Sequence, residues 1–165
     1  MTEVVRENER WAGDGLRVLA VATATVEKGA KAEEAPFEYL GLVGLSDPLR
    51  DGVKELVADL HGAGIRTVMI TGDQSATAYA IATELGLSGG RPLNILDSTD
   101  LSGLDTDTLT GLVQEVDVFA RVSPSHKLEI VQALRRAGQI VAMTGDGIND
   151  GPALKAADVG VAMGS

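Results

Sequence analysis

The sequence predicts an α/β fold in which a mostly parallel sheet is flanked by helices on both faces. Short apolar, β-branched runs alternate with segments whose apolar residues recur at helical spacing. In addition, GAGIRTVMITGD (62–73) and RAGQIVAMTGDG (136–147) both pass from a helix end through an apolar strand to Thr-Gly-Asp. Ligands bind beyond the carboxyl ends of the strands in open α/β sheets. We therefore expect both Thr-Gly-Asp turns to face one crevice.

Composition limits the class of protein. The chain has 165 residues, of which 44% are hydrophobic, enough for the core of one ordinary domain. A net charge of −10 argues against a nucleic-acid partner. The absence of cysteine excludes disulfides and Cys-ligated metal centres. Residues 1–10 lack the apolar region of a signal peptide, and no apolar run reaches the roughly 20 residues of a membrane span. The composition therefore predicts that the isolated chain is soluble and cytoplasmic.

The first 45 residues predict a helix and two strands. Residues 2–12 are polar and predict a short helix, and residues 16–26 and 37–45 are apolar runs typical of strands. The connector 27–36 is charged and of low complexity, as in a surface loop. We place a boundary there, between an appendage (1–36) and a main body (37–165).

The main body alternates helices and strands. Asp47-Pro48 predicts a helix start, because a capping acceptor precedes a proline, and Gly62 ends the apolar stripe that follows. Residues 87–104 are loop-like, and DTDT (105–108) predicts a helix N-cap. The other predicted elements are strands at 67–70, 118–122, 140–143 and 159–163, and helices at 78–85, 109–116, 124–134 and 153–157.

The richest chemical signal is MTGDGINDGPAL, residues 143–154. Asp146 follows a strand, and Asp150 comes four residues later, about one helical turn, so the two carboxylates can converge. With Asn149 beside them they form a set of hard oxygen donors that suits Mg²⁺. The alternatives are a glycine turn with an aspartate helix cap, and a dinucleotide-binding loop, although the third glycine of that loop is missing.

Two further features point to phosphate. Thr71-Gly72-Asp73 offers a hydroxyl and backbone N–H groups at a helix N-terminus, a natural seat for phosphate oxygens; the alternative is an ordinary turn. Lys127 lies on the first turn of a helix, where a cation opposes the helix dipole. Neutralising a bound phosphate would explain its position, and a solvated surface lysine is the alternative.

Five segments together resemble the phosphorylation domain of P-type cation-transporting ATPases. They occur in that family's order and spacing: SDPLR (46–50), MITGD (69–73), FARVSPSHK (119–127), TGDGINDGPAL (144–154) and ADVGVAMG (157–164). WAGDGLRVLAVA (11–22) resembles the end of the family's nucleotide-binding domain. The resemblance implies a haloacid-dehalogenase-like Rossmannoid fold. It also implies a membrane-bound parent protein that is driven by ATP and carries this part on its cytoplasmic side.

The resemblance also implies residue roles at the phosphoryl site. Asp146 would bind the catalytic Mg²⁺, with Asp150 as a further metal ligand and Asn149 in support. Lys127 and Thr71-Gly72 would contact the phosphoryl group.

Near the nucleotide, the resemblance assigns Asp73, Asp47 and Arg50 to contacts with ATP or to the hinge beside it. Gly151 is a departure, because the family commonly has alanine there; the change removes no ligand.

The larger departure concerns the nucleophile. In the family the phosphorylated aspartate lies in a DKTGT motif on the central strand, and this sequence has no DKTGT. The nearest segment is ILDST (95–99), but it lacks the lysine and the glycine and follows MITGD, so we assign Asp97 a loop or turn role. We therefore expect a sheet that lacks its central strand, which would lie between the two Thr-Gly-Asp strands. The chain would then be inactive and would self-associate, unless the remainder of the ATPase supplies the DKTGT strand, the nucleotide-binding domain and the membrane helices.

Three functions stay open on this basis. The first is a fragment of a cation-pumping ATPase. The second is a non-catalytic Mg²⁺- and phosphate-binding regulatory or interaction module. The third is a soluble haloacid-dehalogenase-like phosphatase, which the missing nucleophile disfavours. The transported cation is not encoded here, because its ligands would lie in membrane helices outside this sequence.

Overall fold

A computed structural model describes residues 2–26, 31, 35–46, 48–101, 103–145 and 148–163. In chain order the elements are α1 (Thr2–Gly13), β1 (Arg17–Thr23), β2 (Glu38–Leu45), α2 (Val53–Gly62), β3 (Met69–Ile70), α3 (Ser75–Leu85), β4 (Ile95–Asp97), α4 (Ser98–Leu101), α5 (Thr106–Leu112), β5 (Val118–Ala120), α6 (Pro124–Arg136), β6 (Ala142–Gly145), the 3-10 helix η2 (Ile148–Asp150), α7 (Gly151–Ala156) and β7 (Val159–Ala162). The predicted α/β class is confirmed. None of the helices in these ranges is long and apolar enough to cross a membrane.

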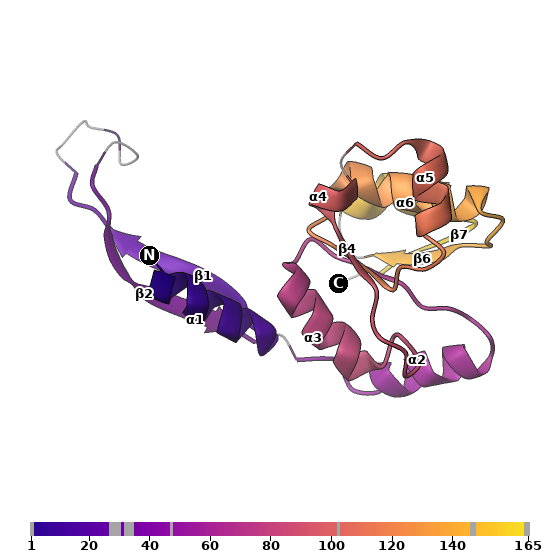
Figure 1. Ribbon diagram of the computed structural model, residues 1–165, viewed down its shortest axis with the longest axis horizontal. Helices are drawn as coiled ribbons and strands as arrows, with labels where there is room; N and C mark the ends of the chain where they lie inside the picture. The colour runs from indigo at the N-terminus through magenta and orange to yellow at the C-terminus, as the bar shows by residue number, and fades with distance from the viewer. Residues whose placement is uncertain are drawn as a thin grey trace.

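The N-terminal elements form an arm that projects from the rest of the molecule (Figure 1). β1 and β2 pair in an antiparallel hairpin, and α1 packs on one face of it. Gly44 permits this packing, because a Cβ there would lie 3.1 Å from the Trp11 ring. The boundary expected between residues 36 and 37 falls in the loop of this hairpin, so β1 and β2 stand on either side of it. The division into domains stays a prediction.

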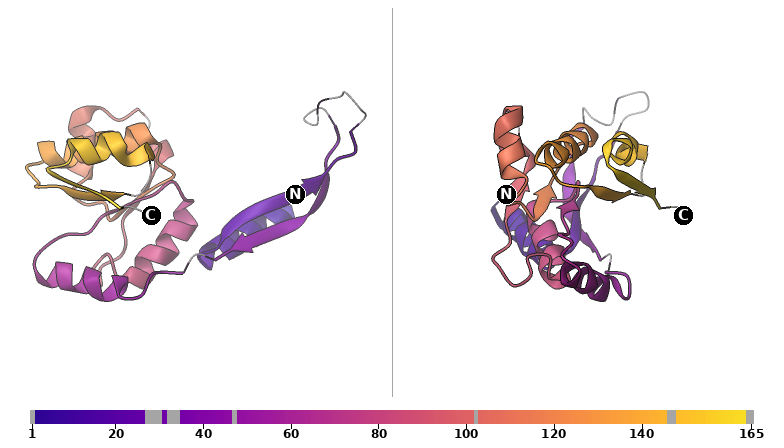
Figure 2. Two further views of the ribbon diagram at one scale, coloured as in Figure 1. Left: turned by 180° about the vertical axis from the view of Figure 1, so that it is seen from behind. Right: turned by 90° about the vertical axis from the view of Figure 1, so that its right-hand side faces the viewer.

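A three-stranded parallel sheet, in the order β3-β5-β4, forms the centre of the body. β5 is buried along its whole length. Its side chains alternate between faces, so Phe119 packs among residues of α5 and α6 while Val118 and Ala120 pack against α2 and α3. Figure 2 shows the corresponding layers, with α5 and α6 on one side of the strands and α2 and α3 on the other.

β6 and β7 form a second, two-stranded parallel sheet. α6 joins the two sheets, because Ile130 packs into the core around Phe119 whereas Val131 packs with Met143 and Ala153. α6 thus packs against both sheets and helps to position the ends of β3 and β6, where a site would lie.

The edges of the two sheets face an interval that no described strand fills. β3 pairs with β5 alone, and β6 with β7 alone, among the strands in the described ranges. The β3-α3-β4 and β5-α6-β6 connections run over opposite faces of the sheet, so their right-handed crossovers place β6 beyond β3. The order is therefore β4-β5-β3, an interval, then β6-β7. This β3/β6 interval is where the sequence predicts a missing central strand.

Capping residues and glycine in the sequence predicted several helix ends correctly. Ser123 caps α6 in a capping box with His126, Asp105 caps α5 by accepting from Thr108, and Gly86 ends α3 with a φ of 71°.

Two element predictions were wrong. α2 begins at Val53 instead of Pro48, because Gly52 adopts a φ of 82°, which a continuous helix does not allow. Asp47 itself lies outside the described residues. The predicted loop 87–104 contains β4 and α4, elements of three and four residues that are too short to produce a periodic pattern.

Candidate functional site

Lys127 and Asp150 form a shielded ion pair at the carboxyl end of β6. Lys127 Nζ donates to Asp150 Oδ1 over 2.6 Å, and the two side chains are only 17% and 9% exposed. Lys127 comes from the first turn of α6, which Ser123 caps, and Asp150 ends η2. The lysine that opposes its helix dipole therefore has a carboxylate partner in this structure, which the sequence did not predict.

Gly145 makes room for the Asp150 carboxylate. A Cβ at Gly145 would lie 2.8 Å from both Cβ and Oδ2 of Asp150, closer than real Cβ contacts come. The carboxylate therefore lies directly against the last residue of β6, with Oδ1 toward Lys127 and Oδ2 toward the strand. This is the edge of a parallel sheet at which ligands bind.

The described donors fit Mg²⁺ in chemical type. Asp150 offers a carboxylate and Asn149, which is exposed, an amide; both are hard oxygen ligands. The room at Gly145 gives the carboxylate a fixed place at the sheet edge. Asp146 lies outside the described residues, and within them no cluster of three or more acidic or histidine side chains could hold a metal alone. Its role as the main metal ligand stays a prediction.

The Thr71-Gly72-Asp73 turn lies at the carboxyl end of β3. Thr71 Oγ1 donates to Asp73 Oδ2 over 2.8 Å and accepts from the Asp73 backbone N–H over 3.1 Å. The turn is fixed to the start of the β5–α6 loop, because Val122 N–H donates to the Thr71 carbonyl and Arg121 N–H to the Asp73 carbonyl. The predicted phosphate site is thus a hydrogen-bonded turn, and the Thr71 hydroxyl is engaged by Asp73 of the same turn.

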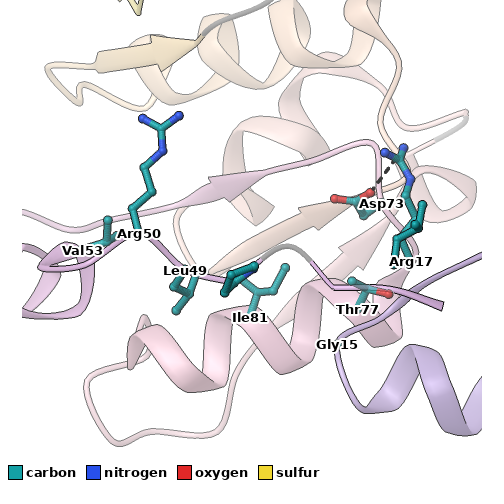
Figure 3. A pocket seen from close by; sticks show the side chains of 10 residues that line it. Gly15, Arg17, Leu49, Arg50, Val53, Asp73, Thr77 and Ile81 are labelled. Carbon is teal, nitrogen blue, oxygen red and sulfur yellow. Dashed lines mark ion pairs between the residues drawn. The ribbon is translucent and has the colours of Figure 1, made fainter.

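A pocket of about 380 Å³ opens between the arm and the body. Figure 3 shows Arg17 and Asp73 at one end of it and Arg50 at the other, with Leu49 and Ile81 between them. Arg17 Nη2 lies 3.8 Å from Asp73 Oδ1, an ion pair that joins β1 to the end of β3. Asp73 and Arg50, both predicted to lie near a nucleotide, therefore line one pocket.

A sequence model of haloacid dehalogenase-like hydrolases matches residues 2–158. The chain belongs to this family. It is 45% identical over 96% of its length to calcium-transporting ATPase type 2C member 1 of Homo sapiens. It is 53% identical over 76% of its length to calcium-transporting ATPase 1 of Bacillus cereus, and 46% identical over 93% to the calcium-transporting ATPase of Bacillus subtilis.

These relatives confirm the resemblance to P-type ATPases. The haloacid dehalogenase-like chain is homologous to the phosphorylation domain of calcium-transporting members. It spans only 16%, 14% and 18% of the length of the three relatives named above.

In this haloacid dehalogenase-like fold the predicted site residues form two groups. The Lys127–Asp150 pair lies at the end of β6, and the Thr71–Asp73 turn at the end of β3, continuous with the pocket through Asp73. Within the described part of the chain the two groups share no hydrogen bond. The β3/β6 interval lies between the strands that carry them.

Sequence reasoning missed two arginines. Arg17 lies in segment 11–22, but its pairing with Asp73 joins residues too far apart for any local pattern to indicate. Arg121 has a φ of 54°, and no other non-glycine residue in the described ranges has a positive φ. A basic residue directly after a buried strand at the ligand-binding edge was the signal that could have found it.

Proposed function

We propose that this chain is part of an ATP-driven, cation-transporting P-type ATPase. It would supply the Mg²⁺- and phosphoryl-binding portion of the site at which an aspartyl phosphate forms and is hydrolysed. The observation that carries the proposal is the placement of the Lys127–Asp150 pair and the Thr71 turn at the ends of two strands with an unfilled strand position between them. A phosphoryl group held in that position would meet polar groups from both sides.

The nucleophile would come from a strand in the remainder of the protein. Successive residues of a strand direct their backbone groups to opposite sides. Thr71 N–H donates to the Phe119 carbonyl in β5, so the preceding residue, Ile70, directs its N–H and C=O toward the interval. The Gly145 carbonyl accepts from Met163 N–H, directly after β7, so Thr144 directs its backbone N–H and C=O to the interval from the other side. A parallel strand inserted here would pair with both edges. Its carboxyl end would emerge between the two polar groups, where the carboxylate of a DKTGT aspartate would attack the γ-phosphorus of ATP and displace ADP.

The described residues have distinct roles in phosphoryl transfer. The transferred group carries negative charge on its equatorial oxygens, and the Lys127 ammonium would offset that charge. Thr71 Oγ1 and the Gly72 N–H would donate to the same oxygens. Asp146 and Asp150, with Asn149 in support, would hold Mg²⁺, which would supply positive charge beside the phosphoryl group.

The pocket between arm and body would take ATP. Its volume of about 380 Å³ suits part of a nucleotide, and the apolar side chains of Leu49 and Ile81 lie between Arg17 and Arg50. Arg17 and Arg50 would bind phosphates, and Asp73 would accept from ribose hydroxyls. The parent protein would also contain a complete nucleotide-binding domain and membrane helices, with this part on the cytoplasmic side. The names of the relatives make Ca²⁺ the cation we propose.

The test is reconstitution. The chain is mixed with a polypeptide that bears a DKTGT strand, and transfer of the γ-phosphoryl group of ATP is followed by radiolabelling. We expect Mg²⁺-dependent, hydroxylamine-labile label on the added polypeptide, no label when its aspartate is replaced by asparagine, and a large loss with Lys127→Met. Binding of the strand without any labelling would contradict the proposal.

A second candidate is a non-catalytic module that binds Mg²⁺ and phosphate. It is favoured by the presence of the Lys127–Asp150 site in a sequence without a DKTGT nucleophile. In the same experiment it predicts binding of Mg²⁺ and inorganic phosphate with no labelling. A soluble phosphatase, in contrast, would have the chain alone hydrolyse a small phosphate monoester.

A further inference from the structure

Asp97 lies where three segments of the ligand-binding sheet edge meet. It is the last residue of β4 and is in register with Ala120, the last residue of β5. Its Oδ2 accepts from Ser75 Oγ over 2.6 Å, and Ser75 is the first residue of α3. Its Oδ1 accepts from the Thr99 backbone N–H over 3.2 Å and from Thr99 Oγ1 over 3.3 Å. Asp97 therefore links the β3–α3 turn to the end of β4.

The charge of Asp97 is also engaged. Burial raises the pKa of its carboxyl, but the hydrogen bonds from Ser75 and Thr99 and the nearby Arg121 guanidinium outweigh burial and hold the pKa below its ordinary value. The carboxylate is therefore ionised at neutral pH and faces the positive charge of the β5–α6 loop.

That loop holds the Thr71–Asp73 turn. Arg121 N–H donates to the Asp73 carbonyl over 2.9 Å, and Val122 N–H donates to the Thr71 carbonyl over 3.1 Å. Both bonds depend on the left-handed backbone at Arg121, whose φ is 54°. Such a conformation persists in a non-glycine residue only where its surroundings fix it. The Asp97 carboxylate supplies a fixed negative charge beside it.

We infer that Asp97 is a positioning residue, which holds the Thr71-Gly72-Asp73 turn in place through Ser75 on one side and through Arg121 on the other. It is not a nucleophile, because its two oxygens are already engaged and β5 separates β4 from the strand that borders the β3/β6 interval. The identity of the ligand at the turn rests on the proposed function, whereas the positioning does not.

The test uses amide hydrogen exchange in the full 165-residue chain. The quantity measured is the exchange rate of Arg121 and Val122 N–H relative to that of Met69 N–H, which donates to the Asp117 carbonyl, just before β5 and away from the turn. We expect Asp97→Ala to raise this ratio at least about tenfold, as for loss of a hydrogen bond to a charged group. Asp97→Asn, which keeps an acceptor for Ser75, should raise it less.

Asp105→Ala is the matched control. Asp105 is also a hydrogen-bonded aspartate with a lowered pKa, but its partner is Thr108 in the first turn of α5. We expect it to leave the ratio unchanged. Ser75→Ala gives a second route to the same measurement if Asp97→Ala does not fold. An unchanged ratio in the Asp97 and Ser75 variants would overturn the positioning role. A uniform rise in the exchange rates of all three amides leaves the ratio unchanged and would overturn it too.

A second measurement separates this inference from the proposed function. The Gly72 N–H signal is titrated with inorganic phosphate in the presence of MgCl₂. We expect phosphate to shift the signal in the wild-type chain and to bind several-fold more weakly to Asp97→Ala. An unchanged Gly72 signal in the wild-type chain would contradict phosphate binding at this turn. The exchange ratio would still decide whether Asp97 positions the turn.

Discussion

Lys127 Nζ lies 2.6 Å from Asp150 Oδ1, in a pair whose side chains are 17% and 9% exposed. A pair so well shielded from water is strongly coupled, and removal of either partner leaves a charge without compensation. The pair joins the first turn of α6 to η2 at the edge of the β3/β6 interval. Like the Thr71-Gly72-Asp73 turn, it lies wholly within the described residues.

Removal of the lysine charge should destabilise the chain. We expect Lys127→Met to lower the free energy of unfolding by about 3 kcal/mol, because Asp150 stays buried without its partner. Millimolar MgCl₂ should restore more stability to this variant than to the wild type, since the metal would supply the missing positive charge. Thermal melting with and without MgCl₂ measures both effects. The exposed Lys155→Met is the control, and an equal loss in the two variants would contradict the prediction.

The contact between Gly145 and Asp150 gives a second prediction. Gly145→Ala should displace the Asp150 carboxylate, because the new Cβ would lie 2.8 Å from it. We expect reduced stability and a weaker response of the melting temperature to MgCl₂. Gly151→Ala is the matched control, since no atom lies within 4 Å of a Cβ there and alanine favours a helix. It should raise stability by up to about 1 kcal/mol; a loss comparable to that of Gly145→Ala would count against the contact.

The pocket leads to a prediction about ATP. Arg17 is 72% exposed and its ion pair with Asp73 spans 3.8 Å, so its contribution to stability should be small. We expect Arg17→Gln to leave the melting temperature nearly unchanged and to weaken ATP binding, measured by calorimetric titration. Arg10→Gln removes an equally solvated pair with Glu7 from α1 and should change neither quantity. Equal ATP affinity in Arg17→Gln and the wild type would exclude Arg17 from the site.

Acid should destabilise the fold through Asp97 and Asp105. Both pKa values lie below the ordinary value of 3.8, so the ionised carboxylates stabilise the folded chain above that pH. This stabilisation is lost as the pH falls through the folded-state pKa values. We expect Asp97→Asn and Asp105→Asn each to flatten the acid side of a plot of melting temperature against pH. Curves parallel to the wild-type curve would contradict the lowered pKa values of Asp97 and Asp105.

The arm gives a prediction about self-association. Leu19 and Val43 lie opposite each other on the hairpin face away from α1, and they are 51% and 45% exposed. An apolar sheet face of this kind favours association. We expect the isolated chain to form concentration-dependent oligomers in sedimentation velocity, and Leu19→Lys to reduce them. A monomer at all concentrations would contradict this prediction.

Patterns that act over short distances were predictable from the sequence. The caps at Ser123 and Asp105, the stop at Gly86 and the order of helices and strands each depend on a few neighbouring residues. The start of α2 was wrong because the conformation of Gly52 overrode a good capping signal.

The remaining relationships depend on tertiary structure. Asp150 meets Lys127, Arg17 meets Asp73 and Asp97 meets Ser75 only after the sheets form, so no spacing in the sequence indicates these partners. The residue types that the sequence indicates for the site stay predictions. The sequence did not predict that Thr71 and Lys127 would each already have an acidic partner.

The central claim is that a strand from the rest of the protein completes this site by entering the β3/β6 interval. The most direct measurement is amide hydrogen exchange of the chain with and without the DKTGT-bearing polypeptide. We predict that Ile70, Ala142 and Thr144 N–H become protected on binding, while Met69 N–H, already bonded to the Asp117 carbonyl, changes little. Binding that protects the arm alone, or that leaves these edge amides unprotected, would contradict the account.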